Sequence, residues 1–234
     1  MTAIFKRELR AYFTSPVGYI YLGVTLFVSG LMFAMLNLSY FMTDMSYYFG
    51  NMTVIFFYTA PFITMRLFTE EKRGKTDQLL LTSPVTVTRI VLGKYLSAVT
   101  LFAITLGVTF VYPAILWLYG DPMLPSVLAL YIGFFLTGSA LISIGVFVSS
   151  TTESQIIAAI VSFVAMFFIQ MMGSLGNILK YPLFKTVIDW LSIMRRYEEF
   201  TTGILSLSSI VYLISFAAVF LFLTVLNIEK KRWS

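Results

Sequence analysis

The run Gly74-Lys75-Thr76 is the stretch whose residue types most directly suggest chemistry, because Gly-Lys-Thr ends a phosphate-binding P-loop. A complete P-loop needs another glycine five positions before Gly74, and Thr69 stands there. Glu70 and Glu71 fall inside the loop, where their carboxylates would repel the phosphates. The preceding segment reads as a membrane span rather than a strand, and no acidic residue ends a second apolar strand to ligate magnesium. The sequence therefore predicts that this chain does not bind ATP.

Other catalytic chemistry has few residues to use. The 234-residue chain contains no cysteine and no histidine, so thiol nucleophiles, imidazole bases and the usual zinc or haem ligand sets are excluded. The paired carboxylates Glu70-Glu71 and Glu198-Glu199 are flanked by basic residues in polar connections, which is typical of solvated surfaces. We therefore predict no catalytic residue, no metal ligand and no cofactor bound by this chain.

The composition points instead to the membrane. Hydrophobic residues make up 59% of the chain and charged residues 12%, against about 45–50% and about 25% in soluble domains. Apolar stretches of about 20 residues, the length that crosses a bilayer, recur along the whole chain. The sequence predicts one all-α polytopic domain, residues 1–234, with six transmembrane helices at about Val17–Leu36, Met52–Phe68, Ile90–Leu118, Val127–Val148, Gln155–Met172 and Ser208–Ile228.

Two segments outside these spans have a helical amphipathic pattern. Residues 1–16 contain such a pattern at Ile4–Phe13, which suits a helix lying in the headgroup region. The connection 173–206 contains apolar residues at helical spacing, which predict a surface helix rather than a span. These apolar residues are Leu183, Phe184, Val187, Ile188, Leu191 and Met194.

The distribution of basic residues predicts the orientation. Six spans put both termini on one side, and only Lys180, Lys185, Arg195 and Arg196 of the 16 basic residues then lie on the other side. Because basic residues favour the cytoplasmic side, both termini are predicted to be cytoplasmic. The net charge of +5 is thus explained by topology, and nucleic acid is not an expected partner.

The polar connection 69–88 includes three consecutive leucines, Leu79–Leu81. Gly74 permits a turn, Thr76 and Asp77 can cap a helix, and Ser83-Pro84 ends it. Exposed to water, the leucines would need a covering surface. The pattern allows either a partner protein or insertion into the lipid interface, and it does not decide between them.

Four parts of the sequence resemble one family. EEKRGKTDQLLLTSPVTVTRIVLGKYLS after the second span is similar to a segment of ATP-binding-cassette type-2 permeases, especially gliding-motility permeases and the permease of nitrous-oxide-reductase maturation. The similarity extends to FKRELRAYFTSPVGYI, SSTTESQIIAA and FLFLTVLNIEKKRW. These parts cover both ends and both cytoplasmic connections, so the resemblance runs along the whole chain.

The resemblance implies the permease subunit of an ATP-driven exporter in the bacterial cytoplasmic membrane. It implies a second permease, identical or paralogous, and two copies of a separate P-loop ATPase subunit that holds ATP and magnesium. Residues 1–16 would be a connecting helix, 69–88 a cytoplasmic coupling segment that contains a coupling helix, and 173–206 a re-entrant external hairpin that closes the path. The implied contacts with the ATPase are Lys75, Thr76, Asp77, Gln78, Leu79, Leu80, Leu81, Thr82, Ser83, Thr152 and Glu153.

Two other functions remain open. An ion-coupled secondary transporter usually carries ionisable residues inside its spans. With the first turns of the third span expected to stand in the headgroups or the cytosol, Arg66 is the one charge assigned inside a span, and its position near the cytoplasmic end predicts a snorkelling side chain. A membrane scaffold that anchors an ATPase without moving a solute is the second alternative.

Overall fold

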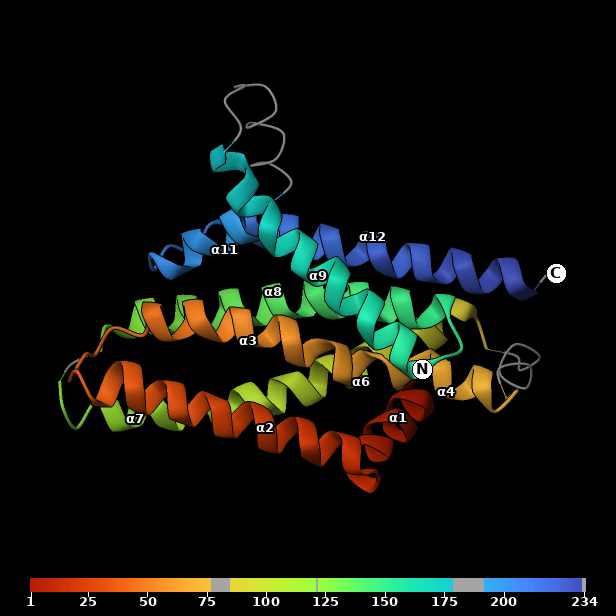
Figure 1. Cartoon of the computed structure of the whole chain (residues 1–234), viewed down its shortest axis with the longest axis horizontal. Coiled ribbons are helices and arrows are strands. Elements are labelled where there is room, and N and C mark those ends of the chain that lie inside the picture. Colours follow the sequence, from red (N-terminus) through yellow and green to blue (C-terminus); the bar gives the residue numbers. More distant parts are fainter. Residues whose placement is uncertain (77–84, 121, 179–191, 233–234) are drawn as a thin grey trace.

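A computed structural model describes residues 1–76, 85–120, 122–178 and 192–232, with the backbone alone at 173–178 and 231–232. Residues 77–84 of the coupling segment and the hairpin residues Leu183 to Leu191 lie outside this described part. The described part contains helices and no strand (Figure 1). The helices are α1 (Thr2–Thr14), α2 (Pro16–Phe33), the π-helix η1 (Ala34–Leu38), α3 (Ser46–Thr64), α4 (Arg66–Arg73), α6 (Val87–Val108), α7 (Val111–Leu116), α8 (Leu124–Thr151), α9 (Gln155–Ile178), α11 (Ile193–Thr201) and α12 (Leu207–Arg232).

The prediction of six membrane spans is confirmed. Six helical segments are long and apolar enough to cross a bilayer: Pro16–Leu38, Ser46–Arg73, Val87–Leu116, Leu124–Thr151, Gln155–Met172 and Leu207–Lys230. Figure 1 shows α1, α4 and the last turns of α12 at the same end of the bundle. We call this end the terminus side and the opposite end, with α7 and α11, the far side.

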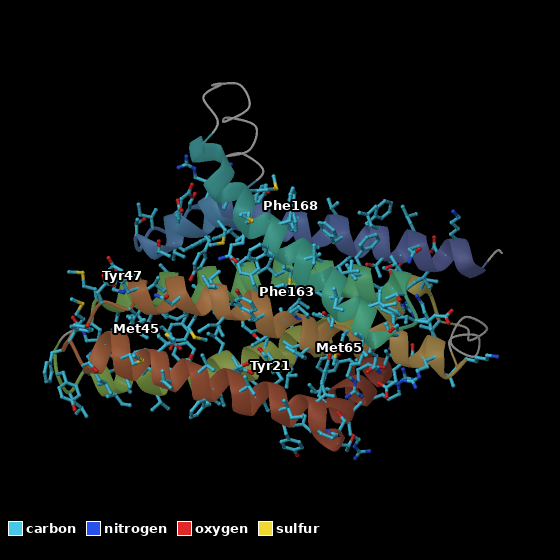
Figure 2. The ribbon with its side chains drawn as sticks, in the orientation of Figure 1. Tyr21, Met45, Tyr47, Met65, Phe163 and Phe168 are labelled. Carbon is cyan, nitrogen blue, oxygen red and sulfur yellow. The ribbon has the colours of Figure 1, made fainter. Side chains whose placement is uncertain are left out.

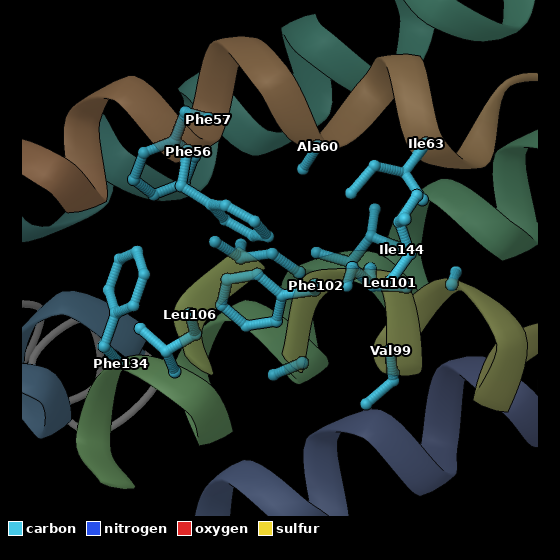
Figure 3. Close-up of a cluster of buried hydrophobic side chains, with 14 of the residues drawn as sticks. Phe56, Phe57, Ala60, Ile63, Val99, Leu101, Phe102, Leu106, Phe134 and Ile144 are labelled. Carbon is cyan, nitrogen blue, oxygen red and sulfur yellow. The ribbon is translucent and has the colours of Figure 1, made fainter. Parts of the chain in front are cut away.

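The central helix of the bundle is α8. Within the apolar window of each span, 78% of the residues of α8 are buried, against 17% for α9 and 22% for the first span. Such an apolar helix that is covered all round forms a core, whereas the outer helices keep an apolar face for lipid or partner proteins. Figure 3 shows part of this core, where Phe56 of α3, Phe102 of α6 and Phe134 of α8 pack together with ring centroids 4.5–5.8 Å apart.

The second span differs from the predicted single helix Met52–Phe68. It consists of α3 and α4, which are separated at Met65, shortly after Pro61, and α4 continues to Arg73. At this junction the hydroxyl of Tyr12, from α1, donates a hydrogen bond to the carbonyl oxygen of Ile63 at 2.6 Å. A backbone break inside a membrane is tolerated when neighbouring groups satisfy its carbonyls.

The third span is also interrupted, and proline explains the break. Pro113 in α7 has no N–H to donate to the carbonyl of Thr109, four residues earlier. That carbonyl oxygen accepts instead from the Tyr112 amide at 2.9 Å and from the hydroxyl of Tyr131, on α8, at 2.8 Å. The predicted span Ile90–Leu118 is therefore α6 followed by the short helix α7, and the freed carbonyl is satisfied in part from a neighbouring helix.

The N-terminal helix predicted at Ile4–Phe13 is present as α1. It packs across the first turns of α6, where a side chain on Gly93 would come within 3.2 Å of Ile4. Its residue Tyr12 is buried against the bundle, and the chain turns at Ser15-Pro16 into α2. The position of α1 in the headgroup region stays a prediction.

On the far side, α11 follows the connection after α9. Ile193, Tyr197 and Phe200 are buried, and the Tyr197 hydroxyl donates to the Phe49 carbonyl of α3 at 3.1 Å. Met194 is the one predicted hairpin residue in the described part, and it packs half-buried against the core. Figure 2 places Tyr47 at the far-side end of α3 and Phe163 and Phe168 on α9.

Candidate functional site

The Gly74-Lys75-Thr76 run closes a helix and does not form a P-loop. It follows α4 rather than a strand, and the amides of Lys75 and Thr76 donate to the carbonyls of Lys72 and Glu71 at 3.0 and 2.9 Å. These two bonds are those of a Schellman motif at a helix C-terminus. The chain turns at Gly74, as predicted, but the left-handed residue is Lys75, with φ of 52°, while Gly74 itself is right-handed.

The two terminus-side connections, 69–88 and 149–154, are joined by one side chain. The ammonium of Lys72 on α4 donates to the carbonyl of Ser150 and, at 3.5 Å, to that of Thr152. Asn227 of α12 donates to the same Ser150 carbonyl at 2.9 Å. Carbonyls at a helix C-terminus have no partner within the helix, so these side chains complete the end of α8. The end of α4 and the end of α8 are thereby held together.

Lys94 of α6 is the most buried charge in this region, with 1% of the side chain exposed. Its ammonium lies 2.9 Å from Glu8 Oε1 and 3.1 Å from Glu71 Oε1, and it donates to the Leu67 carbonyl at 2.5 Å. Arg7 pairs with the same two carboxylates. Arg7, Glu8, Glu71 and Lys94, which we call the charged cluster, carry no net charge and join α1, α4 and α6.

Arg66 does not snorkel, contrary to the prediction. Its side chain is 10% exposed and bonds the hydroxyl of Ser15 between α1 and α2. The guanidinium also lies 5.4 Å from the ring centroid of Tyr12 and 3.2 Å from Glu70. Buried charge is stable only when it is paired and hydrogen-bonded, and Arg66 finds both kinds of partner within the protein.

A cleft of about 620 Å³ opens between α1, α4 and the start of α6. Charged side chains of these helices form much of its wall, and Thr76 and Val85 lie at its edge, on either side of the 77–84 segment. Both carboxylates of the charged cluster have a cation partner at close range. Paired charges of this kind hold the three helices in position, and they leave no free carboxylate in the cluster to transfer protons.

Acid should weaken the charged cluster through Glu8. Burial alone would raise the pKa of Glu8, but the attraction of Lys94 and the hydrogen bonds from Arg7 and Lys94 hold it below its ordinary value of 4.5. A carboxyl whose pKa is lower in the folded than in the unfolded state stabilises the fold at pH values above the unfolded-state pKa. That stabilisation is lost as the pH falls through the folded-state pKa. The melting temperature of Glu8→Gln should lie below that of the wild type at neutral pH, and the gap should close below about pH 4.5. A gap of constant size down to about pH 3.5 would contradict this assignment.

The structure brings together the described residues of the predicted ATPase contact. Lys75, Thr76 and Glu153 are exposed on the terminus side, and Thr152 is half-buried beside Lys72. The contact residues Asp77, Gln78, Leu79, Leu80, Leu81, Thr82 and Ser83 lie outside the described residues, as do Leu183, Phe184, Val187, Ile188 and Leu191 of the hairpin. Met194 lies on the far side, apart from this surface.

Sequence reasoning missed Lys72 and the charged cluster. Lys72 is one of several basic residues in a polar connection, and its spacing from Ser150 follows no pattern. Lys94 gave a usable signal, because it stands in an apolar run seven residues after the start of α6. A lysine in such a run indicates either snorkelling or a buried carboxylate partner.

Residues 31–229 match the family described as ABC-2 family transporter protein. The match covers most of the chain, including α4, Lys72, Lys94 and the end of α8, and it begins after α1. A comparison with curated proteins found no match. The resemblance to type-2 permeases is confirmed for the family, and the likeness to the gliding-motility subgroup stays a prediction. With its six apolar spans and this match, the chain belongs to the ABC-2 family of transporter proteins and is a multi-pass membrane permease.

Proposed function

We propose that this chain is half of an ATP-driven exporter, with ATP and magnesium held by a separate ATPase subunit on the terminus side. The bond from Lys72 to the end of α8 is the observation that carries this proposal. It ties the two connections that the family resemblance assigns to the ATPase into one surface. The basic residues gathered on this side favour the cytoplasm of a bacterial cell.

Movement of the ATPase would reach the membrane by two routes from this surface. The first route is the chain itself, because α4 follows α3 directly. The second is the hydrogen bond from Lys72 of α4 to the end of α8. We propose that closure of two ATPase subunits displaces the 75–83 segment, and that α3 and α8 receive this displacement through α4. Small shifts at such a contact can be amplified because packed helices move as rigid units.

A second permease, identical or paralogous, is expected against α3 and α9. Tyr58 on α3 is 49% exposed in the middle of its span, and its ring lies 5.3 Å from that of Phe163 on α9. Asn51, two turns earlier on α3, is also exposed. Polar groups inside a bilayer normally face other protein or a water-filled path rather than lipid. This face therefore supports a translocation path between two permeases.

Replacing Leu80 with aspartate should abolish binding of the ATPase. Leu80 is the middle residue of the three leucines, and a carboxylate at a buried apolar contact loses its hydration without gaining a partner. The tagged permease would be purified gently from its native host, and co-purifying proteins would be identified by mass spectrometry. We expect a stoichiometric P-loop ATPase with the wild type and none with the variant.

Leu118→Asp is the matched control, because Leu118 is 81% exposed on the far side. It should retain the ATPase. If the wild-type chain purifies alone in its folded form, the ATP-driven function fails, and ion-coupled transport or a scaffold role would be tested next. If an ATPase co-purifies and Leu80→Asp retains it, the coupling segment is assigned to the wrong residues.

A further inference from the structure

The outer face of the bundle carries an apolar groove where α12 crosses α6 and α8. The groove has a volume of about 350 Å³. Its lining includes Leu96 and Val99 of α6, Phe135 of α8, and Leu213, Ala218 and Leu221 of α12. Figure 3 shows Val99 pointing from α6 toward α12, away from the core packing around Phe102. The groove is thus separate from the terminus-side surface and from the α3 and α9 face.

The polar groups that border the groove are satisfied within the protein. The hydroxyl of Tyr95 donates to the Ser139 carbonyl at 3.2 Å, and the Ser139 hydroxyl donates to the Phe135 carbonyl at 2.7 Å. These bonds leave hydrocarbon as the surface that the groove presents. A polar ligand would lose its hydration there without replacement bonds, whereas a hydrocarbon chain loses nothing.

The lining of the groove suits an acyl chain. It presents hydrocarbon from three helices, α6, α8 and α12, and an acyl chain brings only methylene groups, which need no hydrogen-bond partner. An acyl chain is thin enough to lie along the groove between α6 and α12.

A cation lies where the headgroup of such a lipid would be. Arg89, in the first turn of α6, is exposed and has no ion pair among the described residues. Leu96 follows it by two helical turns, about 10 Å deeper in the membrane and on the same helix face. The arginine and the groove are therefore aligned along one side of α6.

We propose that Arg89 and the groove bind one anionic phospholipid from the leaflet on the terminus side. The phosphate lies at Arg89, and an acyl chain runs along Leu96 into the groove. Basic residues near the cytoplasmic surface attract anionic headgroups, each by about fivefold in affinity. The site needs only the membrane fold and does not depend on an ATPase or on transport.

The test measures lipid retention by native mass spectrometry. The purified chain would be incubated with mixed phosphatidylglycerol and phosphatidylcholine and then stripped stepwise with detergent. We expect the wild type to keep one phosphatidylglycerol per chain after other lipids are lost. Ala218→Phe, which fills the groove, should lose it, while Val219→Phe, on the neighbouring exposed face of α12, should keep it.

Charge is tested with a second pair of variants. Arg89→Gln should lower the affinity for phosphatidylglycerol about fivefold, and Lys6→Gln, which removes an exposed cation from α1, should not affect the retained lipid. Adding Arg89→Gln to Ala218→Phe should cause no further loss. The two α12 variants, Ala218→Phe and Val219→Phe, both change exposed residues, and unchanged melting temperatures would verify that they fold.

Three results would overturn the proposal. Equal retention by Ala218→Phe and Val219→Phe would place the lipid elsewhere. Retention of phosphatidylcholine in preference to phosphatidylglycerol would remove the role of Arg89. Loss of a co-purifying membrane protein from Ala218→Phe would identify a protein as the occupant of the groove.

Discussion

Replacing Lys94 with methionine should destabilise the protein by about 3–5 kcal/mol, the usual result of removing one partner from a buried ion pair. Methionine is close to lysine in size, so the loss would come from charge and hydrogen bonding rather than from a cavity. Glu8 and Glu71, which are 12% and 15% exposed, would keep Arg7 as their shared cation, and the Leu67 carbonyl would lose the hydrogen bond from the ammonium. The apparent melting temperature in detergent should fall by on the order of 10 °C.

The rescue variant separates charge balance from simple damage to the core. Adding Glu8→Gln to Lys94→Met removes one charge of each sign and leaves Arg7 paired with Glu71. We expect this double variant to be more stable than Lys94→Met alone, while Lys6→Met, an exposed change on α1, should have no effect. Additive losses in the double variant would refute the cluster as the source of the stability.

Gly145→Val should cause a comparable or larger loss by forcing α8 away from α3. A Cβ atom on Gly145 would lie 2.2 Å from Thr64 Oγ1 and 2.7 Å from Thr64 Cβ. Thr64 is fully buried and its branched side chain is stiff, so it cannot move aside. Overpacking by a methyl group alone costs about 1–3 kcal/mol, and valine adds two more carbons. The yield of monodisperse protein and its melting temperature measure the effect.

Gly107→Val provides the matched control, because an added Cβ at Gly107 has no atom within 4 Å. It should purify like the wild type. Adding Thr64→Ala to Gly145→Val removes Oγ1 and Cγ2 of the clash and should recover part of the yield. Equal yields for Gly145→Val and Gly107→Val would mean that α8 and α3 are less closely packed at this point than the structure indicates.

The spans were predictable from the sequence, but the side chains that stabilise their breaks were not. Length and apolarity are properties of each segment alone, and they gave five spans within three residues of the observed ends, while the second span begins six residues earlier and ends five residues later than predicted. The breaks at Met65 and Thr109 depend on hydroxyls that arrive from other helices, Tyr12 and Tyr131. No local pattern shows which distant side chain will satisfy a freed carbonyl.

The two polar connections of the terminus-side surface were recognisable in the sequence, but the bonds between them were not, and the role of this surface as a site stays a prediction. The two polar connections indicated the terminus-side surface because they interrupt apolar sequence. The bond from Lys94 to Glu8 joins residues 86 positions apart, which no spacing rule connects. Arg66 was misjudged for the same reason, because its partner Ser15 lies 51 positions away.

The nearly complete burial of α8 has a consequence for how a path through the membrane can open. A helix with most of its residues packed against protein cannot rotate without breaking contacts with most of its neighbours. The outer helices α2, α9 and α12 have only one packed face and can slide over it at lower cost. We therefore expect α8 to move only together with the helices packed against it, while the outer helices slide over this unit when a path opens or closes.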